Sequence, residues 1–232
     1  MKSFVLILSA NDAEAVLISR IASAAGIPMI VCDQPHGASL DREPRIVKRI
    51  QAFHARTVVV IEMPGLKNEA RLRQMGMRVH IIDHHTYPGL DQSRQAKSGR
   101  FLPSSLEQFL AFTKITDAQL RAWRFDPRLV HGIGIEDRDF LWGLKRERYR
   151  PAEIRRVYAY HDRLLPVDHA AFRRQMKQAR RAFATRREWR GMIIVRSRAT
   201  RRIRLALSRA VGLAFGRPTP LILIESARRY LY

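Results

Sequence analysis

The first third of the chain alternates short apolar runs with helix-like segments, and this order constrains the fold more than any other feature. Residues 57–61 are continuous and mostly β-branched, as expected of a strand buried on both faces of a parallel sheet. Residues 12–25 carry apolar side chains at helical spacing and are followed by Gly26, a common residue after a helix C-terminus. Further strand candidates lie at residues 4–8, 28–32 and 78–82, and further helix candidates at residues 44–53 and 66–75. The order predicts an α/β fold with a doubly wound, mainly parallel sheet, in which ligands bind at the carboxyl ends of the strands.

The remainder of the chain has a different organisation. Residues 91–99 are polar and turn-like, and residues 104–113 and 116–123 have helical patterns, with Ser104 or Ser105 expected to cap the first of them. The apolar, glycine-spaced residues 129–135 favour one more strand. Two Arg-rich helices are predicted at residues 151–163 and 167–190, and a strand-helix-strand unit at 192–195, 199–215 and 221–224. We therefore expect three parts: a main domain at residues 1–145, an Arg-rich helical connector at 146–190 and a small C-terminal module at 191–232.

Positive charge is concentrated in the second half of the chain. The whole sequence has 43 Lys and Arg against 21 Asp and Glu, a formal net charge of +22. Residues 1–140 contribute 19 basic and 15 acidic side chains, whereas residues 141–232 contribute 24 and 6. Such a field attracts polyanions and favours nucleic acid or a nucleotide as partner. A solvated basic surface, or contact with an anionic membrane, is the alternative.

Cysteine content and hydropathy indicate the compartment. The single cysteine, Cys32, excludes an internal disulfide and favours a reducing cytosol. No apolar run approaches the roughly 18–20 residues of a membrane span. The N-terminal apolar stretch at residues 4–8 is shorter than the roughly 7–15 residues of a signal peptide. We therefore expect a cytoplasmic protein, with no prediction of its oligomeric state.

Acidic and imidazole side chains follow four of the predicted strands. They are Asp12 and Glu14, then Glu62, then Asp83-His84-His85, then Glu136-Asp137. A single carboxylate after a strand most often caps the next helix. In a parallel sheet, however, all of these side chains would meet at one edge, where they must neutralise one another or bind cations. Carboxylates suit hard divalent ions, and imidazole admits manganese, iron or zinc.

The segment Ile81-Ile82-Asp83-His84-His85 resembles the signature of the DHH phosphoesterases, a family that includes RecJ-like exonucleases, oligoribonucleases, cyclic-dinucleotide phosphodiesterases and family II pyrophosphatases. The resemblance covers about residues 3–165. The family's first motif, H-x-D-x-D, matches residues 10–14, its second matches Glu62, and its fourth matches residues 135–140. Three positions depart from the pattern: Ala10 replaces the histidine, and Glu14 and Glu62 replace aspartates. Glutamate keeps the charge but reaches one methylene further, whereas alanine removes a ligand.

The resemblance implies a role for each matching residue. One divalent ion would be held by Glu14, Glu62, His84 and Asp137, and a second, weaker position by Asp12 and Glu62. The expected ion is Mn²⁺, with Mg²⁺ or Fe²⁺ as alternatives, in one or two copies. Asp83 and His85 would be the catalytic pair, with His85 stabilising the phosphate or protonating the leaving oxygen.

The C-terminal module lacks the Gly-rich substrate-binding segment of the family. It has instead Arg196, Ser197 and Arg198 between a predicted strand and a helix expected to begin at residue 199. Guanidinium groups beside helix N-terminal amides form a good phosphate position. We therefore assign these three residues to the substrate phosphate.

Three functions are compatible with these features. The first is a metal-dependent phosphoesterase, a hydrolase acting on a nucleic acid end, an oligonucleotide or a nucleotide. The second is a catalytically impaired DHH relative that binds nucleic acid or nucleotide without turnover, which the loss of the first-motif histidine favours. The third is hydrolysis of pyrophosphate or polyphosphate.

Overall fold

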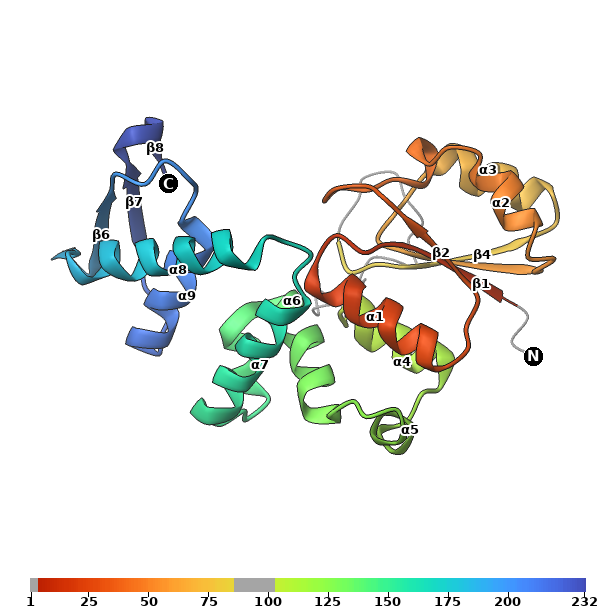
Figure 1. Cartoon of the computed structure of the whole chain (residues 1–232), viewed down its shortest axis with the longest axis horizontal. Coiled ribbons are helices and arrows are strands. Elements are labelled where there is room, and N and C mark those ends of the chain that lie inside the picture. Colours follow the sequence, from red (N-terminus) through yellow and green to blue (C-terminus); the bar gives the residue numbers. More distant parts are fainter. Residues whose placement is uncertain (1–3, 86–102) are drawn as a thin grey trace. The chain divides into compact units, whose positions relative to one another are not determined.

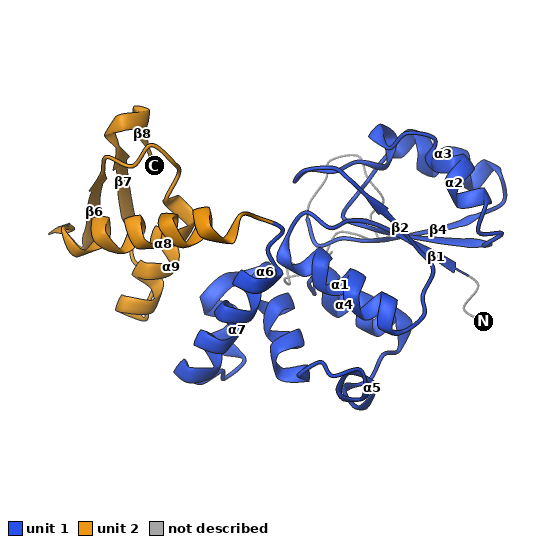
Figure 2. Cartoon of the chain, in the orientation of Figure 1, with its two compact units in different colours: residues 1–166 blue, residues 167–232 orange. Residues whose placement is uncertain are grey.

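The computed structural model describes residues 4–85 and 103–232, so the turn-like segment predicted at residues 91–99 lies outside the described residues. The chain divides into two compact units, residues 1–166 and residues 167–232 (Figure 2). The division falls within the segment that the sequence assigned to the Arg-rich connector. Among the described helices, none combines the length and apolar character that crossing a membrane requires.

Unit 1 contains the parallel sheet that the sequence predicted. Its strands are β1 (Phe4–Ser9), β2 (Met29–Cys32), β3 (Thr57–Ile61) and β4 (Arg78–Ile82), in the order β2-β1-β3-β4 and all parallel. The central strands are apolar along their whole length because both of their faces are covered. Leu6 and Val59 point into one core, whereas Ile7 and Val60 point into a second core on the opposite face. The fold is therefore α/β and doubly wound.

The helices of unit 1 cover the two faces of this sheet (Figure 1). One face is covered by α1 (Ala13–Ala24), α4 (Ser105–Thr113), α6 (Pro127–Arg146) and α7 (Pro151–Leu164), with α5 (Asp117–Ala122) at the margin of the same core. The other face is covered by the 3-10 turn η1 (Leu40–Arg42), α2 (Ile46–Gln51) and α3 (Leu66–Gln74). Helix α1 begins after its cap Asp12 and ends before Gly26, whose φ of +62° suits glycine.

The strand predicted at residues 129–135 is wrong, because these residues form the first half of helix α6. Asp126 caps this helix and Pro127 occupies its first turn, both helix-start signals. The two glycines that suggested a strand instead permit close packing of helices. A Cβ on Gly132 would lie 2.5 Å from Val157 Cγ2 of α7, and one on Gly134 would lie 2.4 Å from Ser104 Oγ, the cap of α4.

Unit 2 contains the predicted strand-helix-strand, with additions at both sides. Strands β6 (Met192–Ser197) and β7 (Leu221–Glu225) are parallel and are joined by α9 (Arg204–Phe215). Strands β5 (Arg187–Trp189) and β8 (Tyr230–Leu231) pair antiparallel to them, giving the order β5-β6-β7-β8. The helix predicted at residues 167–190 is shorter, α8 (His169–Ala184), because the chain continues into β5 and turns at Arg190-Gly191, both with positive φ.

Substituting Gly134→Ala should destabilise unit 1. Alanine normally stabilises a helix relative to glycine by up to about 1 kcal/mol, but here the added Cβ would collide with the capping hydroxyl of Ser104. We expect the free energy of unfolding to fall by about 1–3 kcal/mol, as for other overpacked sites. Urea denaturation followed by circular dichroism measures this change, and an unchanged or raised stability would contradict the close approach of α6 to α4.

Candidate metal centre

Four side chains from four elements meet at the carboxyl edge of the unit 1 sheet. Glu14 lies in the first turn of α1, Glu62 follows β3, His84 follows β4 and Asp137 lies in α6. One ligand atom of each lies within 4.8 Å of those of the other three. A second group, Glu62 with His84 and His85, meets the same criterion. Of the side chains that the sequence was expected to bring to this edge, these converge, whereas Asp12 and Glu136 lie outside both groups.

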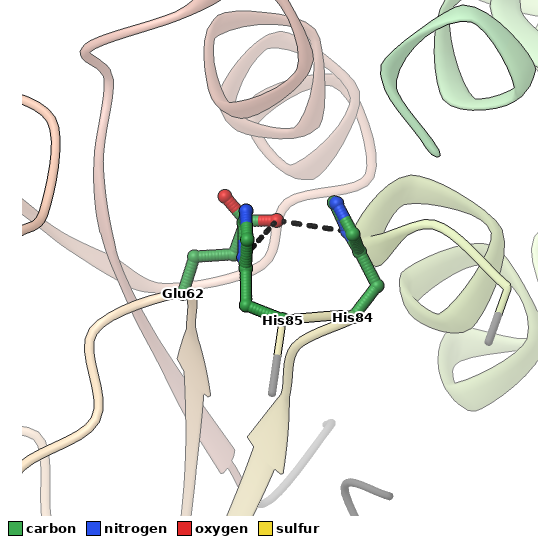
Figure 3. Close-up of side chains that lie close together, drawn as sticks. All are labelled: Glu62, His84 and His85. Atoms are coloured by element: carbon green, nitrogen blue, oxygen red, sulfur yellow. Dashed lines mark ion pairs between the residues drawn. The ribbon is translucent and has the colours of Figure 1, made fainter. Parts of the chain in front are cut away.

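Glu62 is the carboxylate common to both groups. It is the first residue after β3 and has a φ of +49°, a left-handed conformation uncommon outside glycine, asparagine and aspartate. Its Oε1 accepts a hydrogen bond from Ser105 Oγ at 2.7 Å and lies 3.2 Å from His84 Nδ1 and 3.9 Å from His85 Nδ1 (Figure 3). Burial acts to raise the pKa of Glu62, but the hydrogen bonds of His84 and Ser105 and the two imidazole charges outweigh it. The resulting pKa lies below the ordinary value.

Glu14 is almost fully buried, with 1% of its surface exposed. Its Oε1 accepts a hydrogen bond from the backbone N–H of Leu106 at 2.9 Å, in the first turn of α4. Its Oε2 is buried and accepts no hydrogen bond of ordinary geometry from the described residues. Burial, followed by the charges of Asp137 and Glu62, raises the pKa of Glu14 well above its usual value. An oxygen in this position is available to coordinate a cation.

Asp137 completes the cluster from a helix rather than from a strand end. Its Oδ2 lies 3.3 Å from His84 Nε2, so His84 stands between Asp137 and Glu62. Burial raises the pKa of Asp137 to about 7, and the negative charge of Glu62 acts in the same direction. Helix α6 is interrupted immediately afterwards, at Asp139 and Phe140, which have non-helical backbone angles.

Asp12 lies outside the four-residue group. Its Oδ1 caps α1 by accepting a hydrogen bond from the backbone N–H of Ala15 at 2.8 Å. Burial raises its pKa, and Glu62 adds to this effect. The carboxylate thus has the capping role that single acidic residues after strands usually have, and its predicted part in a second ion position stays a prediction.

The donor set of the cluster fits one divalent cation. When all four groups are ionised, three carboxylates and one imidazole carry excess negative charge in a largely buried place, which is costly without a counter-ion and raises the pKa values of Glu14 and Asp137. Carboxylate oxygens with one imidazole nitrogen suit Mn²⁺ or Fe²⁺, and Mg²⁺ less well. The raised pKa values of Glu14 and Asp137 and the buried Oε2 of Glu14 all indicate that the fold brings together more carboxylates than His84 alone neutralises.

Asp83 fixes the position of His85 beside this cluster. The Asp83 side chain is fully buried, and its Oδ1 accepts a hydrogen bond from the backbone N–H of His85 at 2.8 Å and lies 2.9 Å from His85 Nδ1. The hydrogen bond to Asp83 raises the pKa of His85 to about 9, against the opposing effect of burial. The two imidazole rings stack, with their centroids 4.3 Å apart. His85 is 40% exposed and lines a pocket of about 60 Å³ together with Glu62 and His36.

The N-terminus of α4 contributes contacts that sequence reasoning did not assign to the site. Ser104 caps this helix in a capping box with Glu107. The hydroxyl of the neighbouring Ser105 donates to Glu62. Gln108 donates from Nε2 to the backbone carbonyl of Asp83 at 2.9 Å. The sequence signal was the serine pair at a helix start, but only the folded chain shows that this helix points its first turn at the cluster.

The phosphate position predicted at the C-terminal helix is not formed as expected. Helix α9 begins at Arg204 instead of residue 199, and Arg196 and Ser197 are the last residues of β6. Ser197 is buried, and its Oγ accepts a hydrogen bond from the backbone N–H of Ala199 at 3.1 Å. Near the helix start, the backbone N–H of Ile203 already donates to Glu225 at 3.0 Å. Arg196 and Arg198 are exposed, but the N-terminal amides of α9 do not lie next to them in the sequence as expected. Their contact with a substrate phosphate stays a prediction.

Comparisons with known proteins give little similarity. No family model matches the chain, and no curated protein matches it. Among solved structures, a crystal structure of exonuclease RecJ bound to manganese aligns with 12% sequence identity and a TM-score of 0.38, covering 96% of this chain and 75% of that chain. At that level of similarity the activity of the chain must be argued from its own site.

Added Mn²⁺ should raise the melting temperature of the protein, because an ion that binds only the folded cluster stabilises it by about 2.7 kcal/mol at 100 times its Kd. The variant Glu14→Gln should lose this stabilisation while melting no lower than the parent without metal, since it replaces a carboxyl group whose ionised form is disfavoured by burial and by Asp137 and Glu62. Differential scanning calorimetry, with and without EDTA, measures both effects.

Glu69→Gln is the matched control for this prediction. Glu69 is also 1% exposed and accepts a backbone hydrogen bond, from Gly65 at 3.0 Å, but it lies in α3 on the other face of the sheet. It should keep the full response to Mn²⁺. An equal response to Mn²⁺ in the Glu14 and Glu69 variants would place the ion elsewhere.

Proposed function

We propose that this protein is a metal-dependent phosphoesterase that hydrolyses a phosphate ester of a nucleic acid end, an oligonucleotide or a nucleotide. The convergence of Glu14, Glu62, His84 and Asp137 within 4.8 Å carries the proposal. The buried Glu14 Oε2, which accepts no hydrogen bond of ordinary geometry from the described residues, and the raised pKa of Asp137 support it, because a cation would relieve both. His85, which is 40% exposed, lies directly beside the cluster, with its Nδ1 3.9 Å from Glu62 Oε1, and could contact a bound substrate.

The ion that we propose is Mn²⁺, held by the four residues of the cluster. When bound, a divalent ion lowers the pKa of water and neutralises charge on phosphoryl oxygens, the chemistry that ester hydrolysis needs. Ser105 holds Glu62 in place through its hydroxyl, and the first-turn amide of α4 holds Glu14. These contacts fix two of the carboxylates before any ligand arrives, which reduces the reorganisation needed on binding.

We assign His85 as the residue that meets the substrate. Asp83 holds its ring through Nδ1 and favours the protonated imidazole. A protonated imidazole beside the cation position either stabilises a phosphate oxygen or gives a proton to the leaving oxygen. Asp83 is fully buried, so it acts through His85 as a positioning residue.

Charge supports a polyanionic or nucleotide substrate. Unit 2 alone has 17 Lys and Arg against 3 Asp and Glu. The net charge of +22 over the whole chain would steer phosphate-bearing ligands to the protein at low salt. The single free cysteine, Cys32, is buried and agrees with a reducing cytosol.

A catalytically impaired protein that binds nucleic acid without turnover is the alternative. Ala10 stands at the position of the family's first-motif histidine, and Asp12 lies outside the cluster. The chain then offers one well-formed cation position, and a reaction that needs two ions would not proceed there.

The test is hydrolysis of bis(p-nitrophenyl) phosphate and of a labelled oligonucleotide with Mn²⁺ added and then chelated. We expect turnover only with metal, and its loss in His84→Ala and Asp83→Ala. His85→Ala should lower kcat by about 10²- to 10⁴-fold, as for loss of a proton donor, but retain the Mn²⁺ effect on melting temperature. His131→Ala, which removes an exposed histidine paired with Asp117, is the control and should keep full activity.

Absence of turnover with Mn²⁺, Mg²⁺ and Fe²⁺ would contradict the hydrolase. If an oligonucleotide still bound under those conditions, with an affinity that fell steeply with salt, the impaired binding protein would be the function.

A further inference from the structure

The sheet of unit 2 has one covered face and one open face. Ile193 and Val195 of β6 and Leu223 of β7 point to the covered face, where they form a core with α8 and α9. Since successive residues of a strand point to opposite faces, Ile194, Ile222 and their neighbours in register point to the other face. Residues 167–232 are all described, and within this unit no helix packs on that second face.

The open face combines an apolar strip with an exposed tryptophan and arginines. In register across the strands, Arg187 lies beside Ile194 and Ile222, and Arg196 lies beside Ile224 and Leu231. Trp189 lies two residues from Arg187 on the same face of β5 and is 51% exposed, while Leu231 is 70% exposed. Arg187 and Arg196 are also exposed. The Arg190 guanidinium lies over the Trp189 ring, 4.8 Å from its centroid, and adds a third cation at this end of the face.

No acidic side chain of unit 2 points to this face. The unit has only three acidic residues. Asp168 caps α8, and Glu225 is fully buried against the start of α9. Glu188 lies opposite Ile193 and therefore points away from the open face. A ligand on the face would meet apolar side chains, an indole and guanidinium groups, without an acidic side chain to repel it.

We propose that the open face of the unit 2 sheet binds single-stranded nucleic acid. Unpaired bases present π-faces that stack on an exposed tryptophan and apolar side chains, while guanidinium groups contact the phosphates. A duplex keeps its bases stacked and offers no such faces to a sheet. A second copy of this chain would bring another strongly positive unit against the first, with 17 basic and 3 acidic residues on each side.

This inference extends the proposed function by naming the partner, but it does not need the metal centre to turn over. The experiment is therefore run on the full chain in EDTA, where hydrolysis is suppressed. Fluorescence anisotropy would measure the Kd of 20-nucleotide single strands of deoxythymidine and of uridine, and of a 20-base-pair duplex. We expect single strands to bind at least ten times more tightly than the duplex, and an inert metal centre would leave this result unchanged.

Variants of the face give the sharper result. Trp189→Ala should weaken single-strand binding by about 5- to 150-fold, the range for loss of one stacked base, and Trp189→Phe should restore most of it. The double variant Arg187→Ala with Arg196→Ala should reduce the slope of log Kd against log salt concentration by about 1.4. Each phosphate contact to a single strand contributes about 0.7 to this slope. Circular dichroism melting would confirm that each variant is folded.

The control pair, Arg173→Ala with Arg180→Ala, removes the same charge from exposed positions of α8, which packs on the covered face. It should weaken binding less than the open-face pair. Equal weakening by both pairs, or no effect of Trp189→Ala, would overturn the proposal. So would a protein dimer that Trp189→Ala dissociates, or binding to phosphatidylserine vesicles that no single strand displaces.

Discussion

The excess of buried negative charge at the carboxyl edge of the unit 1 sheet is the constraint on which the rest of the site depends. Three carboxylates surround His84, and their ligand atoms lie within 4.8 Å. Burial disfavours their charged forms, so the pKa values of Glu14 and Asp137 are raised. Glu62 holds a left-handed backbone in this arrangement, a conformation that costs about 1–3 kcal/mol for most residues. A divalent cation would offset the cost of bringing the three buried carboxylates together.

Helix α4 links the fold to the site. Its first turn donates to Glu14 from the backbone of Leu106 and to Glu62 from the Ser105 hydroxyl. Contacts with α6 fix the start of α4. Arg138 of α6 forms an ion pair with Glu107 of α4 at 3.0 Å, and Gly134 of α6 has no side chain, which allows Ser104 to lie close to it. The same helix α6 supplies Asp137. The two helices therefore position three of the four cluster residues jointly, and a disturbance of their contact would displace all three.

The sequence predicted the parallel sheet and three of the cluster residues because both follow from local patterns. Strands buried on both faces are continuous apolar runs, and the residues that follow them meet at one edge. Asp137 was expected after a strand at residues 129–135, but these residues form part of helix α6. The glycines that suggested a strand serve instead to bring α6 close to α4 and α7. Ser105 and Gln108 were missed because their contacts join residues far apart in the sequence. The start of α9 was misjudged because buried Glu225, which accepts from Ile203, lies on another strand.

Anomalous scattering at the manganese edge, from crystals grown with Mn²⁺, would test the metal centre directly. One strong peak should lie among Glu14, Glu62, His84 and Asp137, with Glu14 Oε2 among the ligands. A peak at another place, or none at saturating Mn²⁺, would contradict the metal centre and leave the buried carboxylates without a counter-ion.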